Sequence, residues 1–261
     1  MTELSAGLEA AVRETGARLA GLHRTEPLAA TTRAQALRAF AELDAPAAAL
    51  LRERLTALHP GASWVAEELE TAVPADGDWW LCDATDGAVQ YLLGQPHWAV
   101  TATLLRDGEA QLAVVHAPQL GFTYTARRGG GALLNGRPIS PSRRELGAAV
   151  VATSHPPTVA GDPVAVRRAG SSLGAVLAGG VPAVRNLGPT ALQVAQVGSG
   201  HLDAFWEFGL DGGNLLPGAL IAAEAGALVT DHTGAPWRAA ESAGFLAAGP
   251  ATHAELVRLL S

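Results

Sequence analysis

The stretch "WWLCDATDGAVQY", residues 79–91, decides the fold and contains the first candidate functional residues. Its apolar start predicts a buried strand over 79–82, and Asp83 and Asp86 follow three positions apart on a tight turn that contains Gly87. Both carboxylates are therefore expected to face the same point. Negative charges held together in this way are unfavourable unless a cation neutralises them. The rest of the chain must then supply further ligands for such a cation.

The composition limits what kind of protein this is. The chain has 261 residues, of which 48% are hydrophobic, enough for one large α/β domain or two close-packed halves. Its net charge of -7 argues against nonspecific binding to nucleic acid or to an anionic membrane, because both are polyanions. The single cysteine, Cys82, excludes an internal disulfide, and we find no secretory leader or long apolar run, so we expect a soluble cytoplasmic protein. All 18 basic residues are arginine, which excludes Schiff-base lysines, lysine general bases and a phosphate-loop lysine.

The first half of the chain predicts two helices against a mainly antiparallel sheet. Helical spacing covers 4–22 and 31–58. The second pattern is interrupted near Asp44, which suits an N-cap, while Pro46 would lie in the first turn of a new helix. Short strands follow, with the hairpin turn "RDGE" between the third and the fourth. These strands are expected at 63–66, 79–82, 98–106, 110–117 and 122–126.

The second half alternates strands with helices after a glycine-rich turn region at 127–138. Helices are expected near 163–179, 189–198, 214–226 and 251–260, and strands near 148–153, 182–186, 202–207, 227–231 and 244–249. This alternation predicts a layered α/β architecture. A boundary near 140–147 divides the chain into residues 1–145, which carry the metal-site motifs, and residues 146–261, which complete the cleft.

Acidic residues recur at predicted element ends: Asp44 at a helix start, Glu67-Glu68 after one strand, and Asp83 with Asp86 after the next. Carboxylates at the ends of adjacent strands converge on one pocket, and oxygen ligands favour Mg²⁺ over zinc or copper. Each feature also has an ordinary explanation: an N-cap for Asp44, a solvated edge for the glutamates and a common turn for Asp-x-x-Asp-Gly. Their joint occurrence favours a magnesium site.

The same segments resemble the inositol monophosphatase family of lithium-sensitive, Mg²⁺-dependent phosphatases. In that family an acidic pair follows a strand, and the segments W-x-x-D-P-I/L-D-G-T-x-N-F and W-D-x-A-A-G…E-A-G-G come later. This chain has "SWVAEELE", "WWLCDATDGAVQY", "GQPHWAVTATLL", "YTARRGGGALLNG", which is similar to Y-x-A-x-x-G-x-G-A-x-x-N-G, and "DAFWEFGLDGGNLLPGALIAAEAGALVTDHTGAPW" at 203–237. The match runs from about Asp44 to Trp237, with an interruption around 150–180. The resemblance implies an αβαβα sandwich.

The resemblance also implies roles for individual residues. Glu67 resembles a ligand of the first metal, Asp83 the carboxylate that bridges two metals, Thr85 a ligand through its backbone carbonyl, Asp86 a ligand of the second metal, and Asp44 an acid near a third, weaker metal. Glu207 matches an acid that holds substrate hydroxyls, and the backbone N–H groups around Gly87 and Ala88 would hold the phosphate. The implied reaction is in-line attack of metal-activated water on a phosphomonoester.

The chain departs from the family pattern at the chemistry itself. Ala88 stands where the family has a threonine that orients the attacking water, and Asn214 stands where an aspartate completes the second metal site. Asn214 can also simply cap the helix predicted at 214–226. Asp211 is separated from Asn214 by two glycines and is a candidate for supplying the negative charge that Asn214 lacks.

The implied function is a Mg²⁺-dependent phosphatase for a small phosphorylated polyol, sugar or nucleotide-like metabolite, with hydrolysis attenuated by these departures. Two alternatives stay open: a repurposed enzyme that performs elimination, cyclisation or isomerisation in a specialised biosynthetic pathway, and a noncatalytic ligand-binding relative. We expect a homodimer through the apolar hairpin region 98–126 and no nucleic-acid or membrane partner. His97 and His155 are candidate proton donors near the cleft.

Overall fold

The computed structural model describes residues 3–65 and 74–261, so Glu67 and Glu68 lie outside the described residues. The first half forms a seven-stranded sheet in which strands follow their order in the chain; β1 is parallel to β2 and every other pair is antiparallel. Its strands are β1 (Ser63–Trp64), β2 (Asp78–Asp86), β3 (Ala99–Arg106), β4 (Glu109–Ala117), β5 (Phe122–Arg127), β6 (Gly131–Leu134) and β7 (Arg137–Pro138), and its helices are α1 (Glu3–Leu22), α2 (Arg33–Leu58) and α3 (Ala88–Leu92).

The second half forms a mixed five-stranded sheet in the order β11-β12-β10-β8-β9. Its strands are β8 (Val150–Thr153), β9 (Ala183–Arg185), β10 (Ala204–Phe208), β11 (Leu228–Thr230) and β12 (Gly244–Ala248), and its helices are α4 (Pro163–Ala178), α5 (Thr190–Gly198), α6 (Gly212–Glu224) and α7 (His253–Leu260). The β10–β12 and β11–β12 pairs are antiparallel, whereas β8 is parallel to both β9 and β10. The predicted order of elements is confirmed, although α3, β6 and β7 had not been predicted as separate elements.

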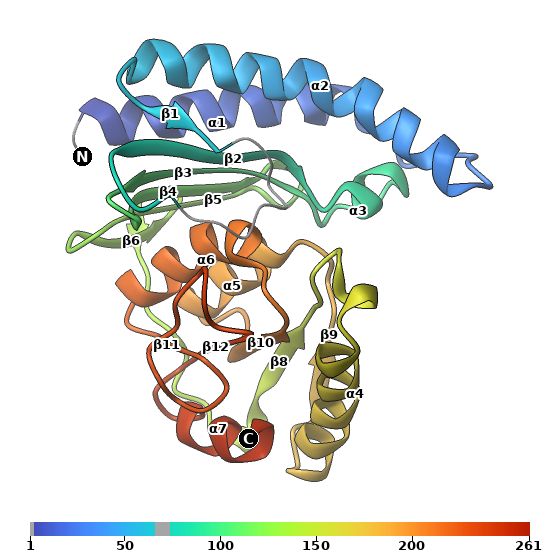
Figure 1. Cartoon of the computed structure of the whole chain (residues 1–261), viewed down its shortest axis with the longest axis vertical. Helices are drawn as coiled ribbons and strands as arrows, with labels where there is room; N and C mark the ends of the chain where they lie inside the picture. The colour runs from blue at the N-terminus through green and yellow to red at the C-terminus, as the bar shows by residue number, and fades with distance from the viewer. Residues whose placement is uncertain (1–2, 66–73) are drawn as a thin grey trace.

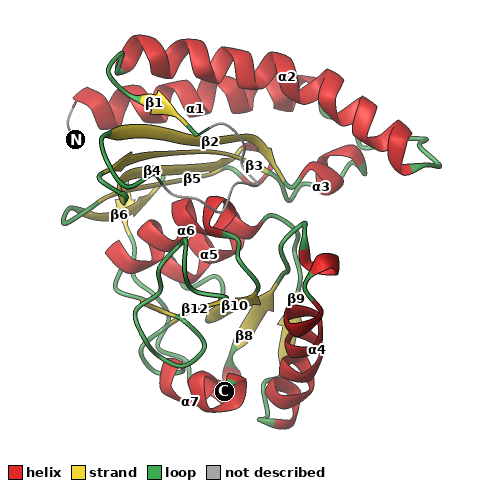
Figure 2. Cartoon of the chain, in the orientation of Figure 1, coloured by secondary structure: helices red, strands yellow, loops and turns green. Residues whose placement is uncertain are grey.

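The elements stack in five layers (Figure 1). Helices α1 and α2 cover one face of the seven-stranded sheet, and α5 and α6 lie between the two sheets; α4 and α7 lie on the far side of the five-stranded sheet (Figure 2). The predicted αβαβα sandwich is therefore confirmed. None of the described helices is long and apolar enough to cross a membrane.

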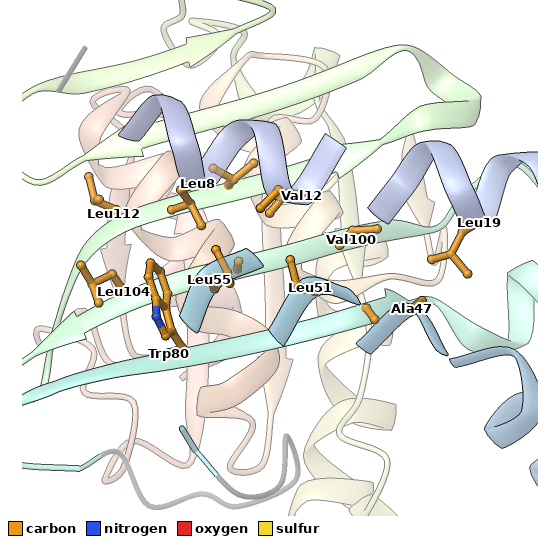
Figure 3. Close-up of a cluster of buried hydrophobic side chains, with 14 of the residues drawn as sticks. Leu8, Val12, Leu19, Ala47, Leu51, Leu55, Trp80, Val100, Leu104 and Leu112 are labelled. Carbon is orange, nitrogen blue, oxygen red and sulfur yellow. The ribbon is translucent and has the colours of Figure 1, made fainter. Parts of the chain in front are cut away.

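Apolar side chains from α1, α2 and the first sheet form one core cluster (Figure 3). Helix α2 presents Leu51 and Leu55 on its buried face, and both belong to the same cluster as Trp80 of β2. Burial of each large apolar side chain contributes about 1.5–3 kcal/mol relative to exposure. This packing holds the strand that carries Asp83 and Asp86 against two helices.

The predicted interruption at Asp44 is wrong, because α2 is continuous from Arg33 to Leu58 and contains Pro46. The N-cap is Thr32, which forms a capping box with Gln35. Proline removes one backbone hydrogen bond from a helix interior, but α2 packs on the core on both sides of it, through the half-buried Leu43 before it and the buried Ala47, Leu51 and Leu55 after it, so packing outweighs that loss. Asp44 is therefore a helix-interior residue rather than a cap.

The predicted turn after residue 82 is also wrong. Strand β2 continues to Asp86, and its register with β3 shifts between Asp83, which pairs with Thr101, and Asp86, which pairs with Ala99. Three steps along β2 thus correspond to two along β3, which is a bulge. A bulge re-aims side chains without ending the strand, and Gly87 then turns the chain into α3 with a φ of 91°.

One further expectation needs correction. Helix α6 begins at Gly212, two residues before the predicted start, so Asn214 lies inside its first turn and Asp211 occupies the N-cap position. Helices cover both faces of β3 and β4 in the hairpin region 98–126, and most side chains of these two strands are buried. The expected homodimer stays a prediction.

Two carboxylates that sequence reasoning missed, the buried Asp203 and the half-buried Glu224, tie the halves of the fold together. Asp203 has a fully buried side chain that accepts hydrogen bonds from Ser142, from Arg144 at 2.9 Å and from the Val150 N–H at 2.6 Å. Glu224 at the end of α6 accepts from two backbone N–H groups of the glycine-rich turn 129–131, at 2.7 and 2.8 Å. The glycine-rich region is therefore a turn, as predicted, and it docks on α6.

His116 of β4 makes stability depend on pH. Its Nδ1 lies 2.9 Å from Thr123 Oγ1, which also accepts a hydrogen bond from Arg13. Burial, with a smaller contribution from the charge of Arg13, lowers the pKa of His116 to about 4. Between about pH 6.5 and 4, His116 binds a proton in the unfolded chain but stays neutral in the folded chain. The free energy of unfolding therefore falls as the pH drops over this range, by up to about 3 kcal/mol.

The His116→Gln variant is therefore expected to show a shallower loss of stability across this pH range, by about 1.4 kcal/mol per pH unit. Urea unfolding at several pH values measures the slope, with His201→Gln, a change at an exposed histidine, as the control. Equal slopes for His116→Gln and the unmodified chain would contradict this assignment.

Candidate active site

Asp83 and Asp44 are linked through Thr85. The Thr85 N–H donates to Asp83 Oδ1 at 2.6 Å, and the Thr85 hydroxyl donates to Asp44 Oδ1 at 2.9 Å. Burial is the main reason that the pKa of Asp83 rises to about 7, and the charge of Asp44 adds to it. Burial likewise raises the pKa of Asp44. Asp83 in the bulge of β2 and Asp44 in the middle of α2 therefore lie close enough for their charges to interact.

Asp86 connects the two halves of the fold. Its carboxylate accepts hydrogen bonds from the backbone N–H groups of Ala191 and Leu192, in the first turn of α5. Pro189 occupies the N-cap position of α5 and gives no side-chain cap, so Asp86 caps this helix from a different sheet. Its Oδ2 is buried and has no hydrogen-bond partner among the described residues.

Glu207 and Asp211 form a second buried acidic pair. Glu207 is 1% exposed, and neither of its carboxylate oxygens has a hydrogen-bond donor among the described residues. Asp211 is 7% exposed, and only its Oδ1 accepts a hydrogen bond, from Asn214 Nδ2 at 2.7 Å. Burial and the charge of Asp211 raise the pKa of Glu207 well above its usual range. The two carboxyls lie close enough to form a hydrogen bond with each other when one of them carries a proton. If both ionise, a cation has to take the place of that proton.

The carboxyls at the end of β2, Asp83 and Asp86, interact electrostatically with the buried pair Glu207 and Asp211. Burial is the main reason that the pKa of Asp86 is raised, and the charges of Asp83 and Asp211 raise it further. Within the described part of the chain, none of Asp83, Asp86, Glu207 and Asp211 forms an ion pair with an arginine. We call these four residues the acidic cluster. It needs protons or a metal cation to compensate its charge.

The donors of the acidic cluster fit Mg²⁺. They are all oxygens, and Asp86 and Asp211 each keep one unpartnered oxygen while Glu207 keeps two. Among residues 3–65 and 74–261, however, no three His, Cys, Asp or Glu side chains stand grouped as a complete metal centre. Glu67 and Glu68 fall in the segment between these ranges. The described residues therefore offer oxygen ligands of the kind that Mg²⁺ prefers, but not a complete set.

The surroundings of the cluster are compact. A Cβ atom on Gly87 would lie 3.0 Å from the His97 carbonyl oxygen and 3.2 Å from Pro189 Cβ, so the chain turns there with no room for a side chain. Ala88 begins α3 directly after this turn. His155 is exposed, and its charge acts on Asp211, so it lies at the rim of the cluster. Cavities of about 410 and 640 Å³ lie elsewhere in the described structure and none of the four acids lines them.

Comparisons with known proteins agree with this arrangement. The model of the inositol monophosphatase family matches residues 1–261. An inositol-1-monophosphatase of Rhizobium meliloti is 35% identical over 199 residues, which is 74% of this chain and 72% of that protein. The Nus factor SuhB of Salmonella typhimurium is 31% identical over 74% of this chain and 71% of its own length.

Among solved structures, the extragenic suppressor protein SuhB of Bartonella henselae superposes with a TM-score of 0.82 at 26% identity, covering 99% of each chain. Fold, acidic cluster and sequence similarity lead to the same conclusion. The chain belongs to the inositol monophosphatase family.

Proposed function

We propose that this protein is a magnesium-dependent phosphatase for a small phosphorylated and hydroxylated metabolite, such as a polyol, a sugar or a nucleotide-like compound. The observation that carries the proposal is the acidic cluster: Asp86 and Asp211 each have one buried oxygen and Glu207 two that lack a donor in the described structure, and none of the four side chains pairs with an arginine there. Burying uncompensated carboxylates is unfavourable, and a cation with oxygen ligands offsets that cost.

Each residue of the site has a proposed role in binding the metal or the substrate. Asp83 and Asp86, with the backbone carbonyl of Thr85 and with Glu67, would hold Mg²⁺, which activates water and offsets the charge of a phosphate when bound. The backbone N–H groups around Gly87 and Ala88, where β2 ends and α3 begins, would hold the phosphate. Glu207 would bind a substrate hydroxyl through its two unpartnered oxygens.

Hydrolysis is expected to be slow. Ala88 has no hydroxyl to orient water, and Asn214 brings an amide where the resemblance implies a charged ligand. The loss of one positioning group costs on the order of 10²-fold in rate. Asn214 donates its amide hydrogen to Asp211 instead, which leaves the second metal position dependent on Asp211.

Release of phosphate from p-nitrophenyl phosphate and from inositol 1-phosphate tests the proposal. We expect slow release that requires Mg²⁺ and stops on addition of EDTA. Absence of release with any phosphomonoester, together with binding of an unphosphorylated metabolite, would favour the repurposed enzyme instead.

Asp211 is proposed to supply the charge that Asn214 lacks. The Asp211→Asn variant is then expected to bind Mg²⁺ about tenfold or more weakly, because one charged oxygen ligand is lost. Calorimetric titration measures the dissociation constant, and Asp76→Asn, the same change at an exposed acid, serves as the control. Unchanged Mg²⁺ affinity in Asp211→Asn would end this assignment while leaving Asp83 and Asp86 as ligands.

A noncatalytic role is the second candidate. It is favoured by the loss of two family residues at Ala88 and Asn214 and by the similarity to a protein named as a Nus factor. Specific binding of a phosphorylated ligand without any turnover would support this role.

A further inference from the structure

A cavity of about 640 Å³ lies beside α6, away from the acidic cluster, and we call it the α6 cavity. Its lining comes from the turn between β3 and β4, from α6 and from the loop that follows β11. These parts pack together, since α6 contacts both β4 and β11 (Figure 1). Helix α6 has Asp211 of the acidic cluster at its N-cap position, whereas its first residue in the lining is Leu216. Binding sites for small molecules occupy about 300–1,000 Å³, so the α6 cavity has the size of such a site.

One part of the lining is apolar. Helix α6 contributes side chains at helical spacing, which therefore share one face of the helix: Leu216, Ala219, Leu220 and Ala223. Val229 of β11 and the half-buried Trp237 extend this apolar surface. The indole ring of Trp237 packs edge-on against Phe245, with 5.0 Å between the ring centroids, so it is held in place. A fixed aromatic ring offers a large apolar area to a ligand at little cost in side-chain entropy.

The other part of the lining is charged, and acids outnumber arginines. The charged residues in the described lining are Asp107, Glu109, Glu224, Glu241, Arg128 and Arg238. Each arginine already has an acidic partner, because Arg128 lies 3.4 Å from Glu109 and Arg238 lies 3.9 Å from Glu241. Neither Asp107 nor Glu224 forms an ion pair within the described part of the chain. The lining therefore carries a net negative charge.

The two unpaired acids are held in position and can still accept hydrogen bonds. Asp107 Oδ1 accepts from the Gly77 N–H at 2.9 Å, and Glu224 accepts from the Gly129 and Gly131 N–H groups at 2.7 and 2.8 Å. These bonds leave the negative charge in place, and a carboxylate offers about four acceptor positions in all. A ligand that donates hydrogen bonds to Asp107 and Glu224 would therefore meet side chains that are already ordered, which favours binding.

We propose that the α6 cavity binds an organic cation, with an ammonium, amidinium or guanidinium group on a flat apolar body. The cationic group would pair with Asp107 and Glu224, and the apolar body would lie against Trp237 and α6. An indole ring also attracts cations through its π-face. An anion would meet the negative charge of the lining, where both arginines are already paired. No three of the described His, Cys, Asp or Glu side chains are grouped as a metal site, so a compact metal ion fits less well. This inference goes beyond the proposed function and does not depend on it.

Three probes of nearly the same shape test the charge of the ligand: benzamidine, benzamide and benzoate, which are cationic, neutral and anionic near neutral pH. Each is titrated into the ¹⁵N-labelled full chain, and the indole N–H signal of Trp237, identified by its loss in Trp237→Phe, is followed by NMR. We expect benzamidine to shift this signal with a Kd of about 0.1–10 mM, the range for a ligand of this size. Benzamide should bind at least about threefold more weakly, and benzoate should not bind.

A variant that fills the cavity tests where benzamidine binds. Ala223 is exposed and lines the cavity, so Ala223→Trp should keep the fold while its indole occupies the space. Benzamidine is then expected to bind at least about tenfold more weakly. Ala17→Trp, the same change at an exposed alanine of α1, is the matched control and should bind normally. Melting temperatures check that both variants are folded.

A variant that removes one charge tests the role of Asp107. Its φ of 50° is a conformation that asparagine also adopts, and asparagine can keep the hydrogen bond from Gly77, so Asp107→Asn should fold normally. Benzamidine is expected to bind about threefold or more weakly to this variant, whereas benzamide should bind as before. Glu42→Gln, which removes a negative charge from an exposed position on α2, is the control.

Three results would contradict the proposal. Absence of any benzamidine-dependent shift of the Trp237 signal, or equal binding of the three probes, would overturn the cationic ligand. Benzamidine binding that is unchanged in a folded Ala223→Trp variant would overturn the α6 cavity as its site. Benzamidine binding that is unchanged in Asp107→Asn would overturn the pairing with this acid.

Discussion

The Asp83→Asn variant is expected to lose Mg²⁺-dependent phosphate release by at least about 10²-fold while its fold stays intact. Asparagine keeps an oxygen that can accept the hydrogen bond from the Thr85 N–H, so the bulge of β2 should persist. The substitution removes the charge that both attracts Mg²⁺ and repels Asp86 and Asp44. Phosphate release at saturating substrate, measured against Mg²⁺ concentration, gives the effect.

The melting temperature separates this result from misfolding. Because the pKa of Asp83 is raised to about 7, its ionised form opposes folding increasingly as the pH rises from about 4 through 7, and the effect is absent below the unfolded pKa. Without Mg²⁺ the variant should therefore melt at the same or a higher temperature than the unmodified chain at neutral pH. The rise in melting temperature that Mg²⁺ gives the unmodified chain should be lost. Full activity in Asp83→Asn, with Asp76→Asn as control, would contradict the proposed role.

The double variant Ala88→Thr/Asn214→Asp is expected to hydrolyse phosphomonoesters about 10²-fold faster than the unmodified chain. Threonine returns a hydroxyl at the start of α3, and aspartate returns a charged ligand in the first turn of α6. The ratio of turnover numbers at saturating Mg²⁺ measures the gain. No gain with any phosphomonoester would show that these two positions do not limit hydrolysis, and would favour a function other than phosphate release.

The single variants separate the two contributions. Asn214→Asp places a second carboxylate where the amide now donates to Asp211 at 2.7 Å, so this variant should melt at a lower temperature without Mg²⁺ and gain more from its addition. Ala88→Thr should raise turnover without changing the Mg²⁺ dependence of melting, because its side chain adds no charge.

The sequence predicted the order of helices and strands well because apolar periodicity is a local signal. It failed where distant packing decides the outcome. Pro46 and Asp44 look locally like the end of one helix and the start of another, yet α2 continues through them and packs on the core through the half-buried Leu43 and the buried Ala47. The bulge between Asp83 and Asp86 depends on the register with β3, which no pattern within β2 reveals.

The candidate site shows the same limit. The sequence pointed to Asp86 and Asp211, but the capping of α5 by Asp86 joins residues about a hundred positions apart, and no local signal predicts it. Asn214 was expected to begin a helix, whereas the preceding glycines are helical and leave the N-cap position to Asp211. The docking of Glu224 on the glycine-rich turn likewise becomes visible only when both sheets are in place.

Calorimetric titration of MgCl₂ into the full chain at neutral pH tests the central claim most directly. The account predicts saturable binding in the unmodified chain that is lost in Asp83→Asn and retained in Asp76→Asn. No binding to the unmodified chain, or equal binding to Asp83→Asn, would show that protons rather than a metal cation compensate the charge of these four acids.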